Sequence, residues 1–423
     1  MEKEYYPIFS QRDYLYIVLF FVSFANSILG SIFMLSLFLY LKSGPEGGVK
    51  ALLLLTTRGL MSSAVATSLD SNIKWIVLIG ISIWMIIGYG IDDEDKKKLS
   101  NVIAALSGFL LAAASGAVFN SSYPLTSIFK MISFALPFVA VMKGIAVTRR
   151  YCRWMDYFSA FYLMLFAISA VLIPYGRFRI TNSDFQGVFN HVNILGIICA
   201  ITIAAFLESN LFRKKTLIRN LVVITILIMC YLSASRTGMF SALAVLGVYF
   251  LCSRGEGTSK IKVVVLVGVL FIAIWLSMGG EIQQLVNNFV WKNSTNSIMD
   301  SRLQLIEMAR TRYESHKLMG TGFMVPYNEG AVDWSLNFNL IVEPGNLVWM
   351  LLGDTGIVGA SFFGILVFAI FKNGTWSRLH LLVGAFIVNM GEMVFFSSNN
   401  MSILIYFLIA VYLFEDNTEV EYV

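Results

Sequence analysis

An arginine among small polar residues, Arg236, is the side chain of this sequence best suited to binding an anionic substrate. Arg236 stands in LSASRTG at 232–238, between two apolar segments that leave almost no loop around it. A guanidinium stays charged and offers a planar fork of donors that matches a phosphate. The hydroxyls of Ser235 and Thr237, with backbone N–H groups at a helix start, would add further donors. The alternative interpretation is an arginine whose charged head reaches the membrane interface.

A second set of polar side chains surrounds the start of an apolar segment at 190–210, in the stretch GVFNHVNILG at 187–196. Its members lie at the entry of the segment or in the loop before it: Asn190, His191, Asn193, Arg177 and Arg179. These donors and acceptors predict a cradle for a sugar or a phosphate. Helix capping and polar packing are the alternative interpretation of the asparagines and the histidine.

A third set lies in a long polar stretch at 280–345. The run DSRLQLIEMARTRY at 300–313 has apolar residues at helical spacing, and a helix there would bring Arg302 and Arg310 close to one face. For Arg310 and Arg312, a solvated amphipathic helix is the favoured interpretation. A loop of this length inside a compact protein is usually functional or disordered.

Acidic residues and an amide stand where the chain returns to apolar sequence. Glu343 and Asn346 belong to EPGN, Asp354 follows in the next apolar segment, and Glu392 precedes SSNN near the end of a later one. Acidic side chains at membrane depth normally face protein or a water-filled cavity. Arginines and a few carboxylates on one face would suit a substrate with a pyrophosphate head and a lipid tail.

Metal and nucleotide chemistry have no support in the sequence. The three histidines are scattered, the four cysteines form no CxxC pair, and the Rossmann and P-loop glycine patterns are absent. We therefore expect no metal and no cofactor. Arginine could take the place of a metal in stabilising a departing pyrophosphate.

The composition fixes the class of protein that must position these groups. Of 423 residues, 57% are hydrophobic and 13% are charged, whereas soluble domains average roughly 45–50% apolar and about 25% charged residues. An ordinary soluble enzyme is thereby excluded. The net charge of +5 is assigned to cytoplasmic loops rather than to binding of nucleic acid. We expect one all-α, polytopic integral membrane domain over residues 1–423.

Apolar runs predict about twelve transmembrane helices. They lie near 14–41, 72–91, 99–119, 124–147, 157–175, 190–210, 219–234, 237–253, 262–279, 346–371, 379–395 and 400–414. The segment 50–68 contains Arg58 and several hydroxyl residues, so we interpret it as re-entrant or interfacial. Thirteen spans are the alternative.

Basic loops predict the orientation of these spans. Their clusters are Lys143/Arg149/Arg150/Arg153, Arg213/Lys214/Lys215/Arg219, Arg254/Lys260/Lys262 and Lys372/Arg378. Even numbers of predicted spans separate them, so all can lie in the cytoplasm together, joined by DDEDKKK at 92–98. Both termini are then cytoplasmic, and the long loop at roughly 280–345 lies outside.

Four motifs in this order resemble the O-antigen polymerase and ligase superfamily (Wzy-type polymerases and related ligases). They are GVFNHVNILG at 187–196, LSASRTG at 232–238, SRLQLIEMA with KLMGTGF between 301 and 323, and GNLVWMLLGDTGIVG at 345–359. The resemblance covers about 187–414. It implies a metal-independent, inverting glycosyltransferase of the GT-C kind, located in the bacterial inner membrane.

The resemblance also implies the substrates and the roles of residues. Undecaprenyl-diphosphate-linked glycans and membrane lipid would be the partners, with a separate chain-length regulator as a further one. Arg236 and Arg302 would bind the donor's pyrophosphate. A general base must reach the acceptor hydroxyl, and Glu343 is the first candidate, His191 the second.

The same motifs favour one member of the superfamily. Ligases usually carry a His-Asn pair where the long loop re-enters the membrane, and here that pair reads Gly345-Asn346. This favours a polymerase of O-antigen or capsule repeat units. The alternatives are an O-antigen ligase and a flippase of lipid-linked oligosaccharide, although a flippase more often shows internal pseudo-symmetry and short loops.

Overall fold

The regular secondary structure of the described residues is helical. The computed structural model describes residues 7–68, 70–175, 178, 184–252, 303–338, 340, 346–397 and 400–414. Within these ranges there is no strand, and a single isolated antiparallel bridge joins Met61 to Phe189. The predicted all-α class is confirmed.

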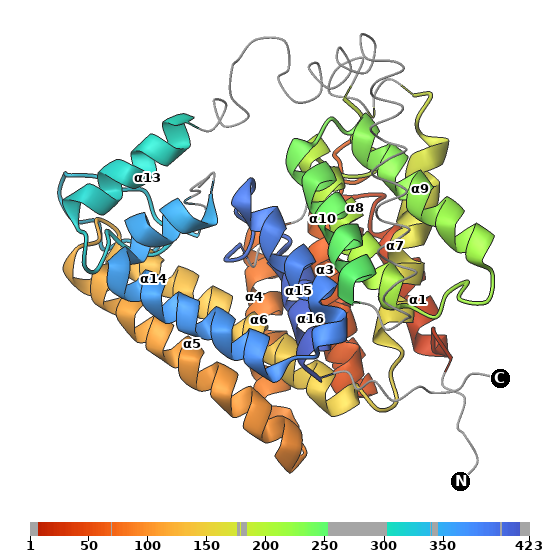
Figure 1. Cartoon of the computed structure of the whole chain (residues 1–423), viewed down its shortest axis with the longest axis horizontal. Helices are drawn as coiled ribbons and strands as arrows, with labels where there is room; N and C mark the ends of the chain where they lie inside the picture. The colour runs from red at the N-terminus through yellow and green to blue at the C-terminus, as the bar shows by residue number, and fades with distance from the viewer. Residues whose placement is uncertain are drawn as a thin grey trace.

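The helices pack side by side into a bundle (Figure 1). They are α1 (Gln11–Val22), α2 (Ser27–Tyr40), α3 (Pro45–Gly59), α4 (Ser71–Gly88), α5 (Asp93–Phe119), α6 (Pro124–Thr148), α7 (Trp154–Val171), α8 (Val192–Glu208), α9 (Thr216–Leu232), α10 (Arg236–Cys252), α13 (Leu303–Ser315), α14 (Leu347–Asn373), α15 (Leu379–Ile387) and α16 (Ser402–Phe414).

Among the described helices, α4, α5, α6, α7 and α14 are long and apolar enough to cross a membrane. Several shorter apolar helices accompany them, including α8, α9, α10 and α16. Large apolar side chains such as Ile87, Leu111 and Phe119 face outward on the bundle, as expected where lipid is the solvent. The chain is a polytopic membrane protein; the number of twelve spans stays a prediction, and the span expected at 262–279 lies outside the described residues.

The prediction of one span at 14–41 is wrong. α1 and α2 form an antiparallel hairpin, because the Tyr16 and Tyr40 rings stack with centroids 3.8 Å apart and the Tyr16 hydroxyl donates to the Ser36 carbonyl. The chain turns at 23–26, where the Asn26 side chain caps α2 by accepting from the N–H of Leu29. An unbroken apolar run hides such a turn, since only the capping residues mark it.

The segment 50–68 is also not an interfacial piece. Its first part belongs to α3, which α2, α4, α6 and α16 enclose in the core. Arg58 is tolerated there because its guanidinium donates to Ser23 Oγ at 2.8 Å and to the carbonyls of Ser23 and Thr67 at 2.9 Å. The arginine thus joins the end of α3 to the α1–α2 turn, and its buried donors are satisfied.

The basic loops that are described gather at one end of the bundle, here called the basic end. Asp95 pairs with Arg149 at 2.7 Å and Asp92 with Arg150 at 2.9 Å, so the loop before α5 meets the loop after α6. The Asn210 N–H donates to Asp156 Oδ1, and Arg378 pairs with Glu208 at 3.2 Å, which brings in two further loops. The cluster Arg254/Lys260/Lys262 lies outside the described residues.

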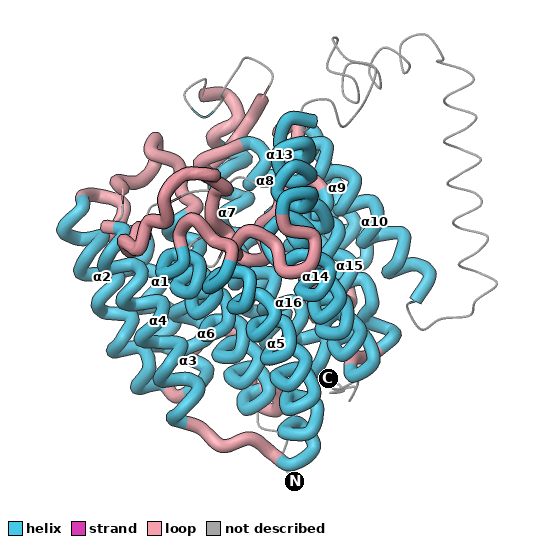
Figure 2. Tube along the Cα trace, turned by 90° about the vertical axis from the view of Figure 1, so that its left-hand side faces the viewer, coloured by secondary structure: helices cyan, strands magenta, loops and turns pink. Residues whose placement is uncertain are grey.

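Long irregular segments cross the other end of the bundle, here called the site end (Figure 2). At this end Ser62 and Leu60, just after α3, bond to the backbone of 188–190 before α8. The two ends therefore separate the loops as the charge pattern predicts: basic loops at one end, and the polar motifs at the other.

Candidate functional site

Three helix N-termini meet at the site end: those of α8, α10 and α14. The turn at 390–392 links them, because Asn346 Nδ2 donates to the Met390 carbonyl at 2.8 Å and Asn193 Nδ2 donates to Glu392 Oε1 at 2.6 Å. Thr237 lies against Gly391, where a Cβ would approach Thr237 Oγ1 within 2.2 Å. Helix N-termini present N–H groups and partial positive charge, so this junction suits an anion.

The position of Arg236 depends on a close crossing of α8 and α10. A Cβ at Gly238 would lie 2.4 Å from the Gly196 carbonyl carbon, and a Cβ at Gly196 would lie 2.3 Å from Ser235 Cβ. The two glycines therefore let the backbones touch, as small residues do where membrane helices pack. Figure 1 shows the two helices side by side. The glycines that end two of the sequence motifs have this packing role.

Gly238→Ala should lower the free energy of unfolding by about 1–3 kcal/mol, because the added methyl group has no space between the helices. Thermal unfolding in detergent micelles measures the change. Gly247→Ala is the matched control, since Gly247 lies on the same helix and a Cβ there would meet nothing within 4 Å. Equal melting temperatures for the two variants would contradict the close crossing.

The residues around Arg236 shape a tight turn between α9 and α10. Ala234 takes a left-handed conformation with φ of 51°, and the buried Ser235 hydroxyl accepts from the N–H of Gly238 at 3.2 Å. Ser235 thus caps α10, and its role as a substrate ligand stays a prediction. Arg236 follows as the first residue of α10, half-buried at the junction.

His191 and its neighbours are arranged as caps and links. His191 Nδ1 accepts from the N–H of Asn193 at 3.1 Å, so the neutral ring carries its proton on Nε2. The lone pair that could take up a proton then lies on Nδ1, where it already accepts the capping hydrogen bond. Protonation would break the cap, which weakens His191 as a general base. Asn190 is exposed, and its N–H donates to the Leu60 carbonyl.

Asn346 is also a cap, because its Oδ1 accepts from the N–H groups of Val348 and Trp349. Its amide thereby ties α14 to the turn at 390–392. Glu392 joins this group through Asn193, 199 positions away in sequence. Sequence reasoning noted Glu392 as an acid at membrane depth without assigning it a role. Arg177, Arg179, Arg302 and Glu343 lie outside the described residues.

Arg310 and Arg312 have different surroundings. The predicted solvated position is correct for Arg310 and wrong for Arg312. Arg310 is exposed and pairs with Glu314 at 2.9 Å on the surface of α13. Arg312 is 7% exposed and forms a buried ion pair with Asp354 of α14. Its Nε also donates to Thr321 Oγ1 at 3.2 Å and its Nη2 to the Val325 carbonyl at 2.6 Å.

The motifs KLMGTGF and GDTGIVG fit together around this ion pair. α14 is kinked at Gly356, whose φ is 64°, and the N–H groups of Thr321 and Gly322 donate to the carbonyls of Gly353 and Asp354. Gly320 also has a positive φ of 71°, and a Cβ there would lie 2.3 Å from the Asp354 carbonyl. We call residues 316–325, with the Arg312–Asp354 pair, the α13–α14 lock.

The lock touches the candidate site through an aromatic cluster. Phe323 lies 5.0 Å from the ring of Phe396, which follows the turn at 390–392. Phe109 of α5 packs against both rings. The position of α13 is thereby coupled to the site by stacked and edge-to-face ring contacts.

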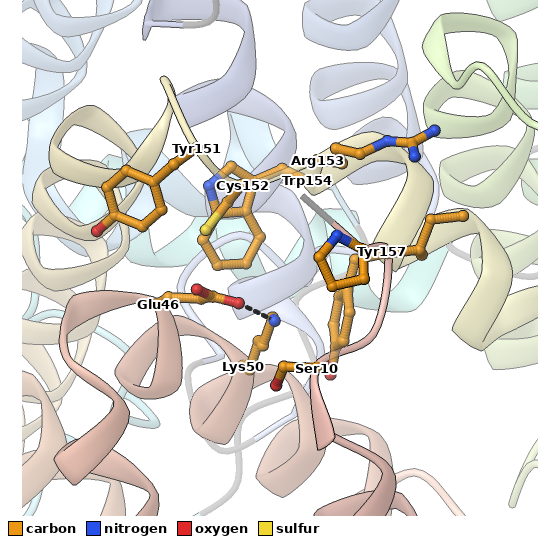
Figure 3. Close-up of a pocket in the computed structure, with 10 residues that line it drawn as sticks. Ser10, Glu46, Lys50, Tyr151, Cys152, Arg153, Trp154 and Tyr157 are labelled. Carbon is orange, nitrogen blue, oxygen red and sulfur yellow. Dashed lines mark hydrogen bonds and ion pairs between the residues drawn. The ribbon is translucent and has the colours of Figure 1, made fainter. Parts of the chain in front are cut away.

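A small pocket of about 100 Å³ lies at the basic end, far from this junction (Figure 3). Glu46 and Lys50 of α3 form an ion pair on one side of it, with Cys152 and Tyr157 on the other. Lys50 also pairs with Asp13 at 2.7 Å. These charges compensate one another, so we give the pocket a structural role.

The Cys152 thiol should react slowly in the folded protein. Burial raises its pKa, and the carboxylate of Glu46 raises it further, so less thiolate is present at any given pH. With Cys152 as the sole cysteine, labelling by iodoacetamide at pH 8 should be much slower in the native than in the denatured state. Glu46→Gln should speed native labelling; an unchanged rate would contradict the contribution of Glu46.

Metal ligands do not cluster in the described ranges, where no three His, Cys, Asp or Glu residues could hold an ion together.

Residues 221–364 match the protein-family model Wzy_C, described as O-antigen ligase. This match supports the resemblance to the O-antigen polymerase and ligase superfamily. The matched segment contains Arg236, α13 and the α13–α14 lock, so it includes the motifs from LSASRTG to GDTGIVG. The superfamily is one of glycosyl-transfer enzymes, ligases and polymerases alike. A search of the curated proteins finds no match.

Proposed function

We propose that this protein joins lipid-linked oligosaccharide repeat units into a polysaccharide at the outer face of the bacterial inner membrane. The observation that carries the proposal is the junction of three helix N-termini around Arg236, at the end opposite the basic loops. Such a junction suits a diphosphate. Because basic loops favour the cytoplasm, the site end is the outer one.

The transfer requires stabilisation of a leaving group and removal of a proton. The acceptor hydroxyl oxygen forms a bond to the anomeric carbon of the donor glycan, while the bond from that carbon to the diphosphate oxygen breaks. The electron pair leaves with undecaprenyl diphosphate, whose charge Arg236 and the helix N-termini stabilise. The hydroxyl proton passes to a carboxylate.

Glu392 is the described carboxylate best placed for that role, because the Asn193 amide holds one of its oxygens and the turn at 390–392 sets it beside the N-terminus of α10. A carboxylate can accept several hydrogen bonds, so a substrate hydroxyl can donate to Glu392 beside its present partners. Glu343, the first candidate from the sequence, stays a second proposal for the base.

A polymerase is proposed rather than a ligase because Gly345 stands where ligases of the superfamily usually carry histidine. In the ligase alternative, the donor is a finished glycan and the acceptor is a different lipid. The two alternatives therefore differ in the product made from repeat units alone.

Purified protein in nanodiscs, given only lipid-linked repeat units from the host strain, should release undecaprenyl diphosphate and form a ladder of longer lipid-linked glycans. EDTA should leave the rate unchanged. Glu392→Gln should lower the rate about 100-fold or more, as loss of a general base does, with Glu94→Gln as a control on an exposed acid at the basic end. A fully active Glu392→Gln variant would exclude Glu392 as the base, and no ladder from wild type would oppose polymerase.

A further inference from the structure

An irregular segment at 326–338, here called the strap, is held across the site end by α6 and the residues just before it. The N–H of Asp333 donates to the Ser122 carbonyl at 2.8 Å, and the N–H of Asn337 donates to Thr126 Oγ1 at 3.1 Å. Thr126 Oγ1 in turn donates to the Ser335 carbonyl at 3.2 Å. The backbone of the strap is therefore fixed through hydrogen bonds to the start of one helix.

The outward side of the strap is apolar and aromatic. Val332, Trp334 and Leu336 are 50%, 60% and 44% exposed. They alternate along the chain with the residues whose backbone bonds to Ser122 or Thr126. A backbone ordered by polar contacts thus presents an indole and two aliphatic side chains outward, which is typical of a binding surface.

Charge favours a glycan over lipid as the occupant of this surface. Glu329 and Asp333 are exposed within the strap, and hydrogen bonds from Ser335 lower the pKa of Asp333, so the surface is acidic. Anionic headgroups would be repelled. An indole face packs against the C–H face of a pyranose ring. Carboxylates accept hydrogen bonds from the sugar hydroxyls, and an amide such as that of Asn328 can accept or donate them.

The strap begins at the α13–α14 lock, which contacts the chain just after the turn at 390–392. Its first residues follow the α13–α14 lock, where Met324 donates its N–H to Asp354 Oδ2 at 2.8 Å, and Phe323 contacts Phe396 near the turn at 390–392. Its last residues reach Phe129 of α6 through Phe338, at 4.8 Å between ring centroids. The strap therefore leads away from the site along the outer surface.

We propose that the strap binds the glycan portion of a substrate, with a neutral or amino-sugar ring on Trp334, and so supports the sugar chain as it extends from the site. This rests on the proposed function, since it names the part of the substrate that this surface takes. The acidic side chains favour neutral or amino sugars over uronates and phosphate-bearing sugars.

Binding of oligosaccharides tests the proposal without requiring catalysis. The probe is a set of lipid-free oligosaccharides of several repeats released from the host's own surface glycan, titrated into the protein in nanodiscs. Trp334→Ala should weaken binding about tenfold or more. Trp376→Ala is the matched control, because Trp376 is 62% exposed at the basic end and should not change binding.

The other outcomes separate this inference from the proposed function. Arg236→Ala should bind the oligosaccharides as wild type does while making no polymer. Equal binding by Trp334→Ala and Trp376→Ala would overturn the role of the strap, whatever the enzyme's activity. Unchanged sugar binding by full-length Trp334→Ala, with less quenching of tryptophan fluorescence by brominated lipid than wild type shows in the same nanodiscs, would overturn the proposal and make Trp334 a membrane anchor instead.

Discussion

Replacing Arg236 by alanine should abolish polymer formation while the protein stays inserted and folded. The charge on the diphosphate grows as the glycosidic bond breaks, and removal of one positioned donor from such a site costs roughly 10²–10³ in rate. Arg236 is the arginine placed at the junction of three helix N-termini, next to the turn that carries Glu392. Its loss should therefore act on the chemical step rather than on folding.

The measurement is the glycan ladder made by the variant, together with its level in the membrane. Arg236→Lys should recover only part of the activity, because an ammonium keeps the charge and loses the fork of donors. Arg310→Ala removes an exposed arginine of α13 and should make a normal ladder. A ladder of normal length from Arg236→Ala would exclude the diphosphate role.

Arg312→Met should destabilise the protein by about 3–5 kcal/mol, because it leaves the Asp354 carboxylate buried without its cation. The α13–α14 lock would open, α13 would no longer pack firmly against α14, and enzymatic activity should fall as a result. Thermal unfolding in micelles measures the loss of stability, and limited proteolysis after α13 measures the opening of the lock.

The double variant Arg312→Met, Asp354→Leu should recover much of the lost stability, since no charge is then left unpaired. Arg310→Ala, on the same helix, should leave the melting temperature nearly unchanged because its partner is exposed. If Arg312→Met melts with wild type, the buried ion pair does not hold the lock.

Basic clusters and apolar runs predicted much of the fold, because each can be recognised from consecutive residues. The long helices α5, α6 and α14 lie where apolar runs predicted them, and the described basic loops share one end. The hairpin of α1 and α2 was missed because the turn at 23–26 interrupts hydropathy too little to be seen. The hairpin replaces one predicted span by two helices, and α3 adds a further crossing of the bundle, so the loops from α4 onward keep their predicted ends.

The candidate site was predicted only in its local parts. Arg236, His191 and Asn346 could be picked out because each stands at the start of an apolar segment, where capping residues are needed. The partners that hold the site, Asn193 with Glu392 and Arg312 with Asp354, are far apart in sequence. Nothing local distinguishes the buried Arg312 from the exposed Arg310 two positions earlier.

The size distribution of surface glycan in a strain lacking this gene tests the central claim most directly. Single repeat units on the surface, with the ladder restored by the wild-type gene and not by Arg236→Ala, are the predicted result. Long chains held on undecaprenyl diphosphate would contradict it and indicate a ligase. Single units trapped on the cytoplasmic face would contradict it and indicate a flippase.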